Sequence, residues 1–539
     1  MSQHKHVVSP LLAAVTALSL VLAGCASYSD LSPQLQAKLI DELSSEQALG
    51  AQDRDVNGDL WPKQRWWRQF ADPQLDQLVE EALAGSPELD QASARLRAAM
   101  AVARVADAAR GPSYSASFDS QYQRFTENGV IPPPYGGMRE SNNDLTTHFT
   151  YRLDFWGRDR AALQAALSRQ REAQAEGAEA ELVLATVVAS QYVELAHWYA
   201  LLDVAEDTLA QRQSIYDLTA KRVEAGIDTS VQLKQAESEL PAIRGEIAAL
   251  HEAINASRYS LAALLGAGPD RGLEIHHPQL SWNGQNGAAL PRMIPLGLLG
   301  RRPDIVAARW RVEAVKGDVE VAKAEFYPDV NLTAFAGFSS IGLDNLLDSG
   351  SRVYGVGPAI SLPLFASGTL RGHLSERLAA YDSAVASYNR ALTDALKQVA
   401  VSLDGEYWLV ERRKQQRAAL ETTQEALALA TDRYRAGLGN YLTVLQAQTA
   451  VLQRQREGVA LNARALGLRI DLIKALGGGF DQADAENSVT GQVIGPATGS
   501  TTGAATTPMT TPATEQTIAP THASNTTDST GVRDDNITG

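Results

Sequence analysis

The sequence has one cysteine, few aromatic residues and fewer basic than acidic residues. One cysteine in 539 residues excludes an internal disulfide and a Cys-x-x-Cys zinc or redox site. Aromatic residues make up 6 % of the chain, hydrophobic residues 44 % and charged residues 21 %, a composition close to that of soluble proteins and unlike a bundle of membrane-spanning helices. Because 63 acidic residues outnumber 48 basic ones, for a formal charge of −15, we expect no nucleic acid partner.

Motifs of the common enzyme classes are also absent. The sequence contains no GxxxxGK[ST] phosphate-binding loop, no HExxH zinc motif and no GxSxG nucleophile motif. His276 and His277 are adjacent, and we interpret them as part of a solvated connector rather than a metal site. Asp154, Arg158 and Arg160 are interpreted as an ion-paired group at an interface. We therefore predict that the chain is not an enzyme and has no catalytic residue, metal site or cofactor.

The N-terminus has the features of a secretory signal. Residues 7–24 form an uncharged apolar run that ends in small residues and follows a segment with one lysine. A membrane anchor is the alternative, but a run of about 18 residues is at the lower limit for a span, and this one contains Pro10. We predict that residues 1–24 are a lipoprotein signal peptide that is removed on export.

The apolar run ends in Leu22-Ala-Gly-Cys25, which resembles the lipobox of bacterial lipoproteins. The resemblance implies cleavage just before Cys25 and a covalent lipid on its thiol. A buried, unmodified cysteine is the alternative. Because Ala26 follows the cysteine where inner-membrane lipoproteins have aspartate, the resemblance also implies the outer membrane.

Residues 478–539 are predicted to form a disordered, threonine-rich tail. From position 481 onward there is no Phe, Trp, Tyr, Leu or Lys, and 15 of the 59 residues are threonine. Such a segment cannot bury enough apolar surface to offset the entropy of ordering. We assign no chemistry to it.

The sequence between these ends contains one unit twice. The copies span residues 75–266 and 291–477, with a connector at 267–290 between them and a lipid-anchored segment at 25–74 before them. Residues that coincide at a shift of 211 positions are Arg222 with Arg433, Gly226 with Gly437, Gln235 with Gln446, and Gly266 with Gly477. So long a period indicates a duplicated domain rather than a solenoid.

Each copy is predicted to contain a helix, two strands, a long helix and a shorter helix. The strands alternate apolar and polar residues with a period of two, which gives each strand one apolar face. The residues of these faces are Tyr114, Ala116, Phe118 and Tyr122; Leu145, Thr147, Phe149, Tyr151, Leu153 and Phe155; Val330, Leu332, Ala334, Ala336 and Phe338; and Tyr354, Val356, Pro358, Ile360, Leu362 and Leu364.

Strands of about ten residues have the length that crosses an outer membrane at a tilt. A half-buried sheet in a soluble domain is the alternative, but the lipoprotein signal favours the membrane. Four strands cannot close a barrel, because the smallest membrane barrels have about eight and an open edge in lipid leaves backbone groups unpaired. Several chains must therefore contribute to one barrel.

Two helices of about 100 Å are predicted at residues 159–225 and 369–436. Apolar residues recur in them at coiled-coil spacing, which predicts a buried seam. The seam residues are Val188, Tyr192, Leu195, Tyr199, Leu202, Leu209, Tyr216 and Val223 in the first helix, and Leu392, Leu396, Val399, Leu403, Tyr407 and Val410 in the second.

Both long helices end in matched turn signals. Basic residues lie in the last turn of each helix, and Gly226 and Gly437 follow as left-handed caps. Thr229 with Gln232 forms a capping box, and Asn440 caps the second returning helix. We therefore predict two helical hairpins with both tips at one end, about 100 Å from the strands.

Several short motifs follow one another along residues 61–477. They are Pro87-Glu-Leu with a following Ala-Arg-Leu-Arg, Leu153-Asp-Phe-Trp-Gly-Arg158, Arg302-Pro-Asp-Ile305, Phe326-Tyr-Pro328, Leu362-Pro-Leu-Phe365 and Tyr434-Arg-Ala-Gly437. Each is weak alone. In this order, and with the duplication, the chain resembles the outer membrane efflux proteins of the TolC family, in particular their lipoprotein branch (OprM- and NodT-like).

The resemblance implies a mostly α-helical fold with a small β part. In this family three chains form a 12-stranded outer-membrane β-barrel, which a tunnel of coiled-coil helical hairpins continues through the periplasm. The homotrimer is a passive exit duct for drugs or other small toxic compounds, which an inner-membrane pump delivers through a periplasmic adaptor protein. The adaptor is expected to dock on the hairpin tips, at Ala225, Gly226, Ile227, Ala436, Gly437 and Leu438.

The residues just beyond the tips depart from the family pattern. Relatives often carry aspartate there, as a charged ring that narrows the periplasmic mouth, whereas this chain has glutamine and threonine. Our gate candidates are Asp228, Gln232, Gln235, Thr443 and Gln446. Asp228 is the nearest acid at a tip. The other four candidates are uncharged, so we predict that the ring they form is neutral.

One alternative function remains open at this point. A lipid-anchored periplasmic coiled-coil scaffold without a pore would account for the helices. It would not account for four amphipathic strands with tyrosine and phenylalanine on one face.

Overall fold

The computed structural model describes residues 27–39, 42–44, 61–280, 298, 300–363 and 366–482. The predicted signal peptide, Cys25 and nearly all of the predicted tail lie outside these residues. The described elements belong to one compact unit, Met1–Glu486.

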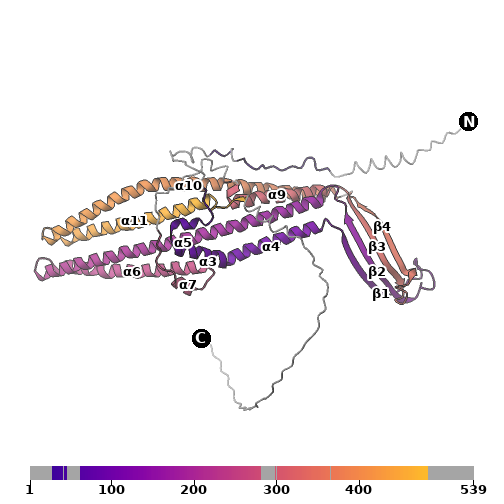
Figure 1. Cartoon of the computed structure of the whole chain (residues 1–539), viewed down its shortest axis with the longest axis horizontal. Helices are drawn as coiled ribbons and strands as arrows, with labels where there is room; N and C mark the ends of the chain where they lie inside the picture. The colour runs from indigo at the N-terminus through magenta and orange to yellow at the C-terminus, as the bar shows by residue number, and fades with distance from the viewer. Residues whose placement is uncertain are drawn as a thin grey trace, which may run out of the picture. The chain divides into compact units, whose positions relative to one another are not determined.

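The two copies contain the same elements in the same order, as predicted (Figure 1). The first copy contains α4 (Pro87–Ala108), β1 (Ser113–Arg124), β2 (Arg139–Arg152), α5 (Arg158–Glu224) and α6 (Ser230–Leu264). The second contains α9 (Pro303–Ala324), β3 (Asp329–Ile341), β4 (Arg352–Ser361), α10 (Ser367–Arg435) and α11 (Tyr441–Ala475). The remaining short helices are η2 (Trp66–Phe70), α3 (Pro73–Gly85), α7 (Pro269–Leu273) and η3 (Ser349–Ser351).

Local sequence signals explain where the helices before the strands begin. The side chains of Asp72 and Ser86 accept hydrogen bonds from the first-turn N–H groups of α3 and α4, and a proline follows each of them. α9 likewise begins at Pro303. Proline fits this position because it has no N–H that would remain unpaired.

The four strands form one antiparallel sheet in the order β1-β2-β3-β4. Their register aligns the apolar residues, since Tyr114 pairs with Phe149, Phe149 with Ala334, and Ala334 with Val356. One face of the sheet is therefore apolar across all four strands, as the alternation predicted. Among the described residues, the outer edges of β1 and β4 have no partner strand.

Some strand boundaries differ from the prediction. β2 begins six residues before Leu145, because polar residues ahead of Leu145 pair with β1 without alternating in hydrophobicity. β2 ends at Arg152 and β4 at Ser361, where the chain turns toward the long helices. The predicted strand residues beyond these ends are Leu153, Phe155, Leu362 and Leu364, the last of which lies outside the described residues.

The long helices α5 and α10 contain 67 and 69 residues, about 100 Å each at 1.5 Å per residue. Each folds back into a shorter helix, and α5 lies against α11. Figure 1 shows both hairpin turns at one end of these helices and the strands at the other, which confirms the predicted placement of the tips. No helix in the described ranges is both long and apolar enough to cross a membrane.

The predicted seam of α5, from Val188 to Leu209, lies in the largest hydrophobic core, whereas Tyr216 packs on the cluster near the tips. Val188, Tyr192 and Leu195 are fully buried. They share one cluster with Leu250 of α6 and with Trp66 of η2, so the core joins the hairpin to the segment before the first copy. This packing fixes the base of the first hairpin.

The seam of α10 follows the prediction only in its first half. Its residues are buried or half-buried as far as Leu403, whereas Tyr407 and Val410 are 52 % and 72 % exposed. Beyond Leu403, α10 presents Leu409 to Leu461 of α11. The prediction was wrong here because the buried stripe shifts to another set of helical positions.

Candidate functional site

The first hairpin tip contains the predicted caps. Gly226 has a φ of 71°, the left-handed conformation that favours glycine. The N–H of Ile227 donates to the carbonyl of Arg222 at 2.9 Å, which closes the end of α5. The N–H of Thr229 donates to Oε1 of Gln232 at 2.6 Å, and this capping box begins α6.

The second tip repeats this construction. Gly437 has a φ of 78°, and the N–H of Leu438 donates to the carbonyl of Arg433 at 2.9 Å. Asn440 then caps α11, because its Oδ1 accepts from the N–H of Thr443 at 3.0 Å. Both predicted turns are confirmed.

Large apolar side chains are exposed at both tips. Ile227 and Leu438, each next to its cap glycine, are 60 % and 72 % exposed, and Val231 and Leu442 in the first turn of the returning helices are also exposed. Exposed apolar patches of this kind mark sites of protein contact. The tips thus combine a hydrogen-bonded turn with exposed apolar side chains.

A polar cluster links the two tips within the chain. Nε of Arg222 lies 2.7 Å from Oδ2 of Asp228, and both side chains are less than a tenth exposed. The Tyr434 hydroxyl donates to the same carboxylate oxygen at 2.6 Å and lies 2.9 Å from Oγ1 of Thr219. The Arg222 guanidinium also lies 4.5 Å from the centre of the Tyr434 ring. One carboxylate of the first tip thus binds residues of both hairpins.

This cluster shifts the acidity of its members. Hydrogen bonds from Arg222, and then from Tyr434, lower the pKa of Asp228 although burial opposes the shift. Burial, and next the hydrogen bond to Asp228, raises the pKa of Tyr434. Asp228 is therefore a charged group inside the tip.

The structure divides the five gate candidates into two groups. Asp228 is buried against Arg222 and Tyr434, and Gln232 is used in the capping box. The exposed candidates are Gln235, Thr443 and Gln446.

Sequence analysis missed the roles of Thr219 and Tyr434. Tyr434 entered only as part of a motif, and Arg222 only as a cation at the end of a helix. One signal was available, because Tyr434 corresponds to Val223 at the shift of 211, so only the second copy has a tyrosine at this position. The partner of the Tyr434 hydroxyl cannot be predicted from spacing, since Thr219 and Tyr434 are 215 residues apart.

The apolar face of the sheet exposes large side chains. Tyr114, Tyr122, Tyr354 and Val356 are each more than 70 % exposed in the single chain. The opposite face is largely polar, and His148 lies 3.0 Å from Oγ1 of Thr146 there. An apolar exposed face together with a polar one is the pattern of a membrane strand that also lines a water-filled interior.

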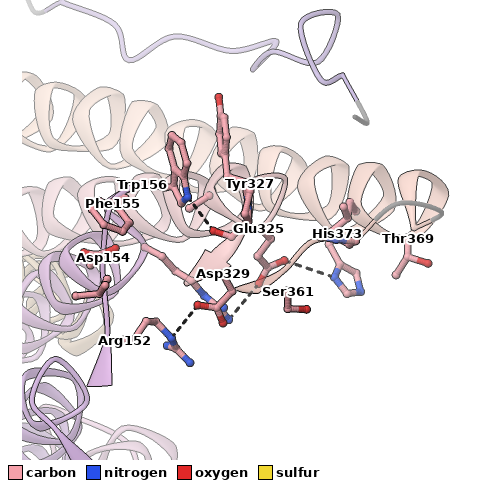
Figure 2. Close-up of a pocket in the computed structure, with 16 residues that line it drawn as sticks. Arg152, Asp154, Phe155, Trp156, Glu325, Tyr327, Asp329, Ser361, Thr369 and His373 are labelled. Atoms are coloured by element: carbon pink, nitrogen blue, oxygen red, sulfur yellow. Dashed lines mark hydrogen bonds and ion pairs between the residues drawn. The ribbon is translucent and has the colours of Figure 1, made fainter. Parts of the chain in front are cut away.

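Figure 2 shows the border at which the strands continue into helices, around a cavity of about 360 Å³. Nη1 of Arg152 at the end of β2 lies 3.0 Å from Oδ1 of Asp159 in α5. Trp156 stacks on Tyr327 with ring centres 4.7 Å apart and donates from Nε1 to the carbonyl of Pro328 at 2.8 Å. The Trp156 contacts join the turn after β2 to the turn before β3, and so link the two copies.

The three charged residues that follow β2, Asp154, Arg158 and Arg160, make two separate contacts. Asp154 accepts from the N–H of Arg160 at 3.0 Å, whereas Arg158 lies 3.8 Å from Glu325. His277 packs edge-on against Tyr199. Within the described ranges, no three His, Cys, Asp or Glu side chains gather to hold a metal ion.

The chain matches a known family over most of its length. The family model described as outer membrane efflux protein matches residues 78–267 and 296–478. The fusaric acid resistance protein FusA of Burkholderia cepacia is 40 % identical over 364 residues, which are 67 % of this chain and 68 % of FusA. The multidrug resistance outer membrane protein MdtP of Escherichia coli is 33 % identical over 486 residues, which are 88 % of this chain and 97 % of MdtP.

A solved structure agrees with these matches. The crystal structure of the outer membrane protein VceC from Vibrio cholerae superposes with a TM-score of 0.73 and 39 % identity, covering 78 % of this chain and 100 % of that chain. The family is one of efflux channels, which confirms the predictions of no enzyme activity and of a place in the outer membrane and periplasm. The chain therefore belongs to the outer membrane efflux protein family and is an efflux channel of the outer membrane.

Proposed function

We propose that three copies of this chain close one 12-stranded barrel and so form the exit duct of a tripartite efflux system. The observation that carries the proposal is the sheet itself. It has one continuous apolar face and, among the described strands, two unpartnered edges at β1 and β4. In lipid such edges must pair, and three sets of four strands give a closed barrel of a known size.

A periplasmic adaptor is proposed to dock on the tips and to connect the duct to an inner-membrane pump. Ile227 and Leu438 support this proposal, because they are exposed on turns that are closed by backbone hydrogen bonds next to the glycine caps. The energy for export would come from the pump, since the duct itself is a passive conduit.

The exported compounds are proposed to be small toxic organic molecules. Relatives of the chain are named for resistance to fusaric acid, for multidrug resistance and for toluene efflux. A duct of this kind selects little, so the pump would set the identity of the compound.

A covalent lipid on Cys25 is proposed to hold the N-terminus in the outer membrane. Cys25→Ser is expected to reduce the amount of assembled channel without abolishing membrane association, because the sheet also buries apolar area in lipid. Membrane fractionation with metabolic palmitate labelling measures both effects. A fully soluble Cys25→Ser variant would contradict the proposal that the strands lie in the membrane.

The mouth of the duct is predicted to discriminate weakly between cations and anions. The exposed gate candidates Gln235, Thr443 and Gln446 are uncharged. Gln446→Asp is therefore expected to raise cation selectivity and block by divalent ions, measured as the reversal potential of reconstituted channels in a salt gradient. Unchanged selectivity in this variant would contradict the assignment of Gln446 to the narrow periplasmic mouth of the duct.

Alkaline extraction followed by protease digestion tests the channel against a scaffold held by lipid alone. Membranes are washed with high salt and alkali and then digested. We expect fragments that cover β1–β2 and β3–β4 to remain in the membrane, even in Cys25→Ser. Loss of both fragments would contradict a barrel.

A further inference from the structure

The polar face of the sheet carries one large apolar ring. Phe335 lies near the middle of β3, where it pairs with His148 of β2 and Gly355 of β4. Because paired residues share a face, all three lie opposite the face of Tyr114 and Phe149. Among the described strand residues of this polar face, Phe335 is the one phenylalanine, tyrosine or tryptophan.

The sheet does not need this ring for its packing. The Phe335 side chain is 44 % exposed, and its neighbours on the same face of β3 are Thr333 and Gly337. An apolar ring that stays in contact with water is unfavourable for the folded chain by itself. We therefore asked what the surroundings of Phe335 hold in place.

Gly355 makes room for the Phe335 ring. A Cβ atom at position 355 would lie 2.7 Å from Cε1 and 2.9 Å from Cζ of Phe335, too close for any side chain to be added without moving the ring. The ring therefore leans across β4 instead of standing upright from β3. One of its faces lies toward the sheet, and the other remains open.

His148 lies beside the open ring. Its imidazole centre is 6.3 Å from the centre of the Phe335 ring, with 35° between the planes. Nε2 of His148 lies 3.0 Å from Oγ1 of Thr146, which in turn lies 3.2 Å from Oγ of Ser117. The other ring nitrogen of His148 has no hydrogen-bond partner among the described residues. Since His148 is exposed, this nitrogen can bind a polar group of a ligand.

The position in the sheet leaves this group accessible after assembly. β2 and β3 are the inner strands, as Figure 1 shows, so pairing of the outer edges of β1 and β4 with other copies does not cover Phe335 or His148. Twelve strands about 4.8 Å apart and tilted by about 40° enclose a backbone cylinder about 24 Å wide. Three phenylalanine rings, one from each copy, line such an interior without closing it.

We propose that Phe335, with His148 beside it and Gly355 beneath it, is a transient binding site for planar aromatic compounds that pass through the barrel. The inference rests on the proposed trimeric duct, because the polar face encloses an interior only when the barrel closes. Every exported compound then passes the level of Phe335. A planar aromatic ring can stack on the open face of Phe335 while its polar substituent binds His148.

The site is suited to weak and rapidly reversible binding. It offers a ligand one ring face and one hydrogen-bonding nitrogen per copy, on a surface that is otherwise polar and wet. A conduit needs contacts that are weak enough for the ligand to leave, because tight binding would block later molecules. Aromatic compounds are therefore expected to dwell at this level longer than aliphatic ones of the same charge.

Block of the ion current by naphthalenesulfonate tests the site in the full-length channel, reconstituted in planar bilayers. Phe335→Thr is expected to raise the concentration for half-maximal block about three- to tenfold, since it removes one aromatic stacking contact. Threonine already occupies the same face at Thr333, so the strand should tolerate it. Cyclohexanesulfonate, which has the same charge but no aromatic ring, should block weakly and to the same extent in both channels.

Two further variants separate aromatic stacking from other effects. Phe335→Leu keeps an apolar side chain but has no flat face, so it is expected to weaken block by naphthalenesulfonate as Phe335→Thr does. Thr333→Ser is the matched control, because it changes the adjacent position on the same face of β3 and should leave block unchanged. Wild-type block in Phe335→Leu would contradict an aromatic site.

The outcomes also distinguish this inference from the proposed duct. Equal half-blocking concentrations in the wild type and in Phe335→Thr, with normal ion currents in both, would overturn the binding site and leave the barrel intact. A wild-type protein that forms no conducting channel would contradict the barrel, and the binding site with it.

Discussion

Replacing Gly226 and Gly437 together by valine is expected to abolish efflux-dependent resistance while leaving the assembled channel intact. Both glycines have a positive φ, at which a β-branched side chain costs about 1–2 kcal/mol per residue. The space around Gly226 is open, so the damage arises from the backbone and stays local to the tip. Growth of a strain that depends on this channel, with a toxic substrate present, measures the loss.

Asparagine at the same two positions is the matched control. Asparagine adopts the left-handed conformation far more readily than valine, so Gly226→Asn with Gly437→Asn is expected to keep most of the resistance. Full resistance in the double valine variant would contradict the role of the tips in docking.

Asp228→Asn is expected to loosen the two tips and to raise the conductance of the reconstituted channel. The variant leaves the Arg222 side chain, 9 % exposed, without its carboxylate, at a cost of about 1–3 kcal/mol. It also weakens the bond from Tyr434, which belongs to the other hairpin. Asp217→Asn is the control, because Asp217 is an exposed residue of α5, the helix that carries Arg222.

The same cluster predicts the response to pH. Because the pKa of Asp228 is lowered in the folded chain, its contribution is complete above the ordinary value of about 3.9 and is lost only as the pH falls through the lower, folded value. Conductance of the wild type should therefore stay constant from pH 7 to about 5. A rise within that range, or an unchanged conductance in Asp228→Asn, would contradict this function of the cluster.

The elements of the fold were predictable because their signals are local. The turn residues Gly226, Thr229 and Asn440 act on neighbours within a few positions, and the alternation along each strand selects one face regardless of what lies opposite. Long helices without proline leave few alternatives. These signals are sufficient for element order and sheet face.

The failures share a different cause, since each depends on residues distant in sequence. β2 extends over polar residues because β1 lies beside them, and Tyr407 is exposed because α11 meets α10 along Leu409. The contact of Asp228 with Tyr434 joins residues 206 positions apart, and no local pattern indicates it. The contacts of Gln34 and Lys38 with α10 connect residues about 350 positions apart, which no local pattern predicts.

The mass of the lipidated particle extracted in mild detergent tests the central claim most directly. Three chains per particle would match a barrel whose strands are shared between copies, and would leave the edges of β1 and β4 paired. A particle of one chain would leave four strands with open edges, which lipid does not tolerate. That result would contradict the duct and favour a lipid-anchored scaffold.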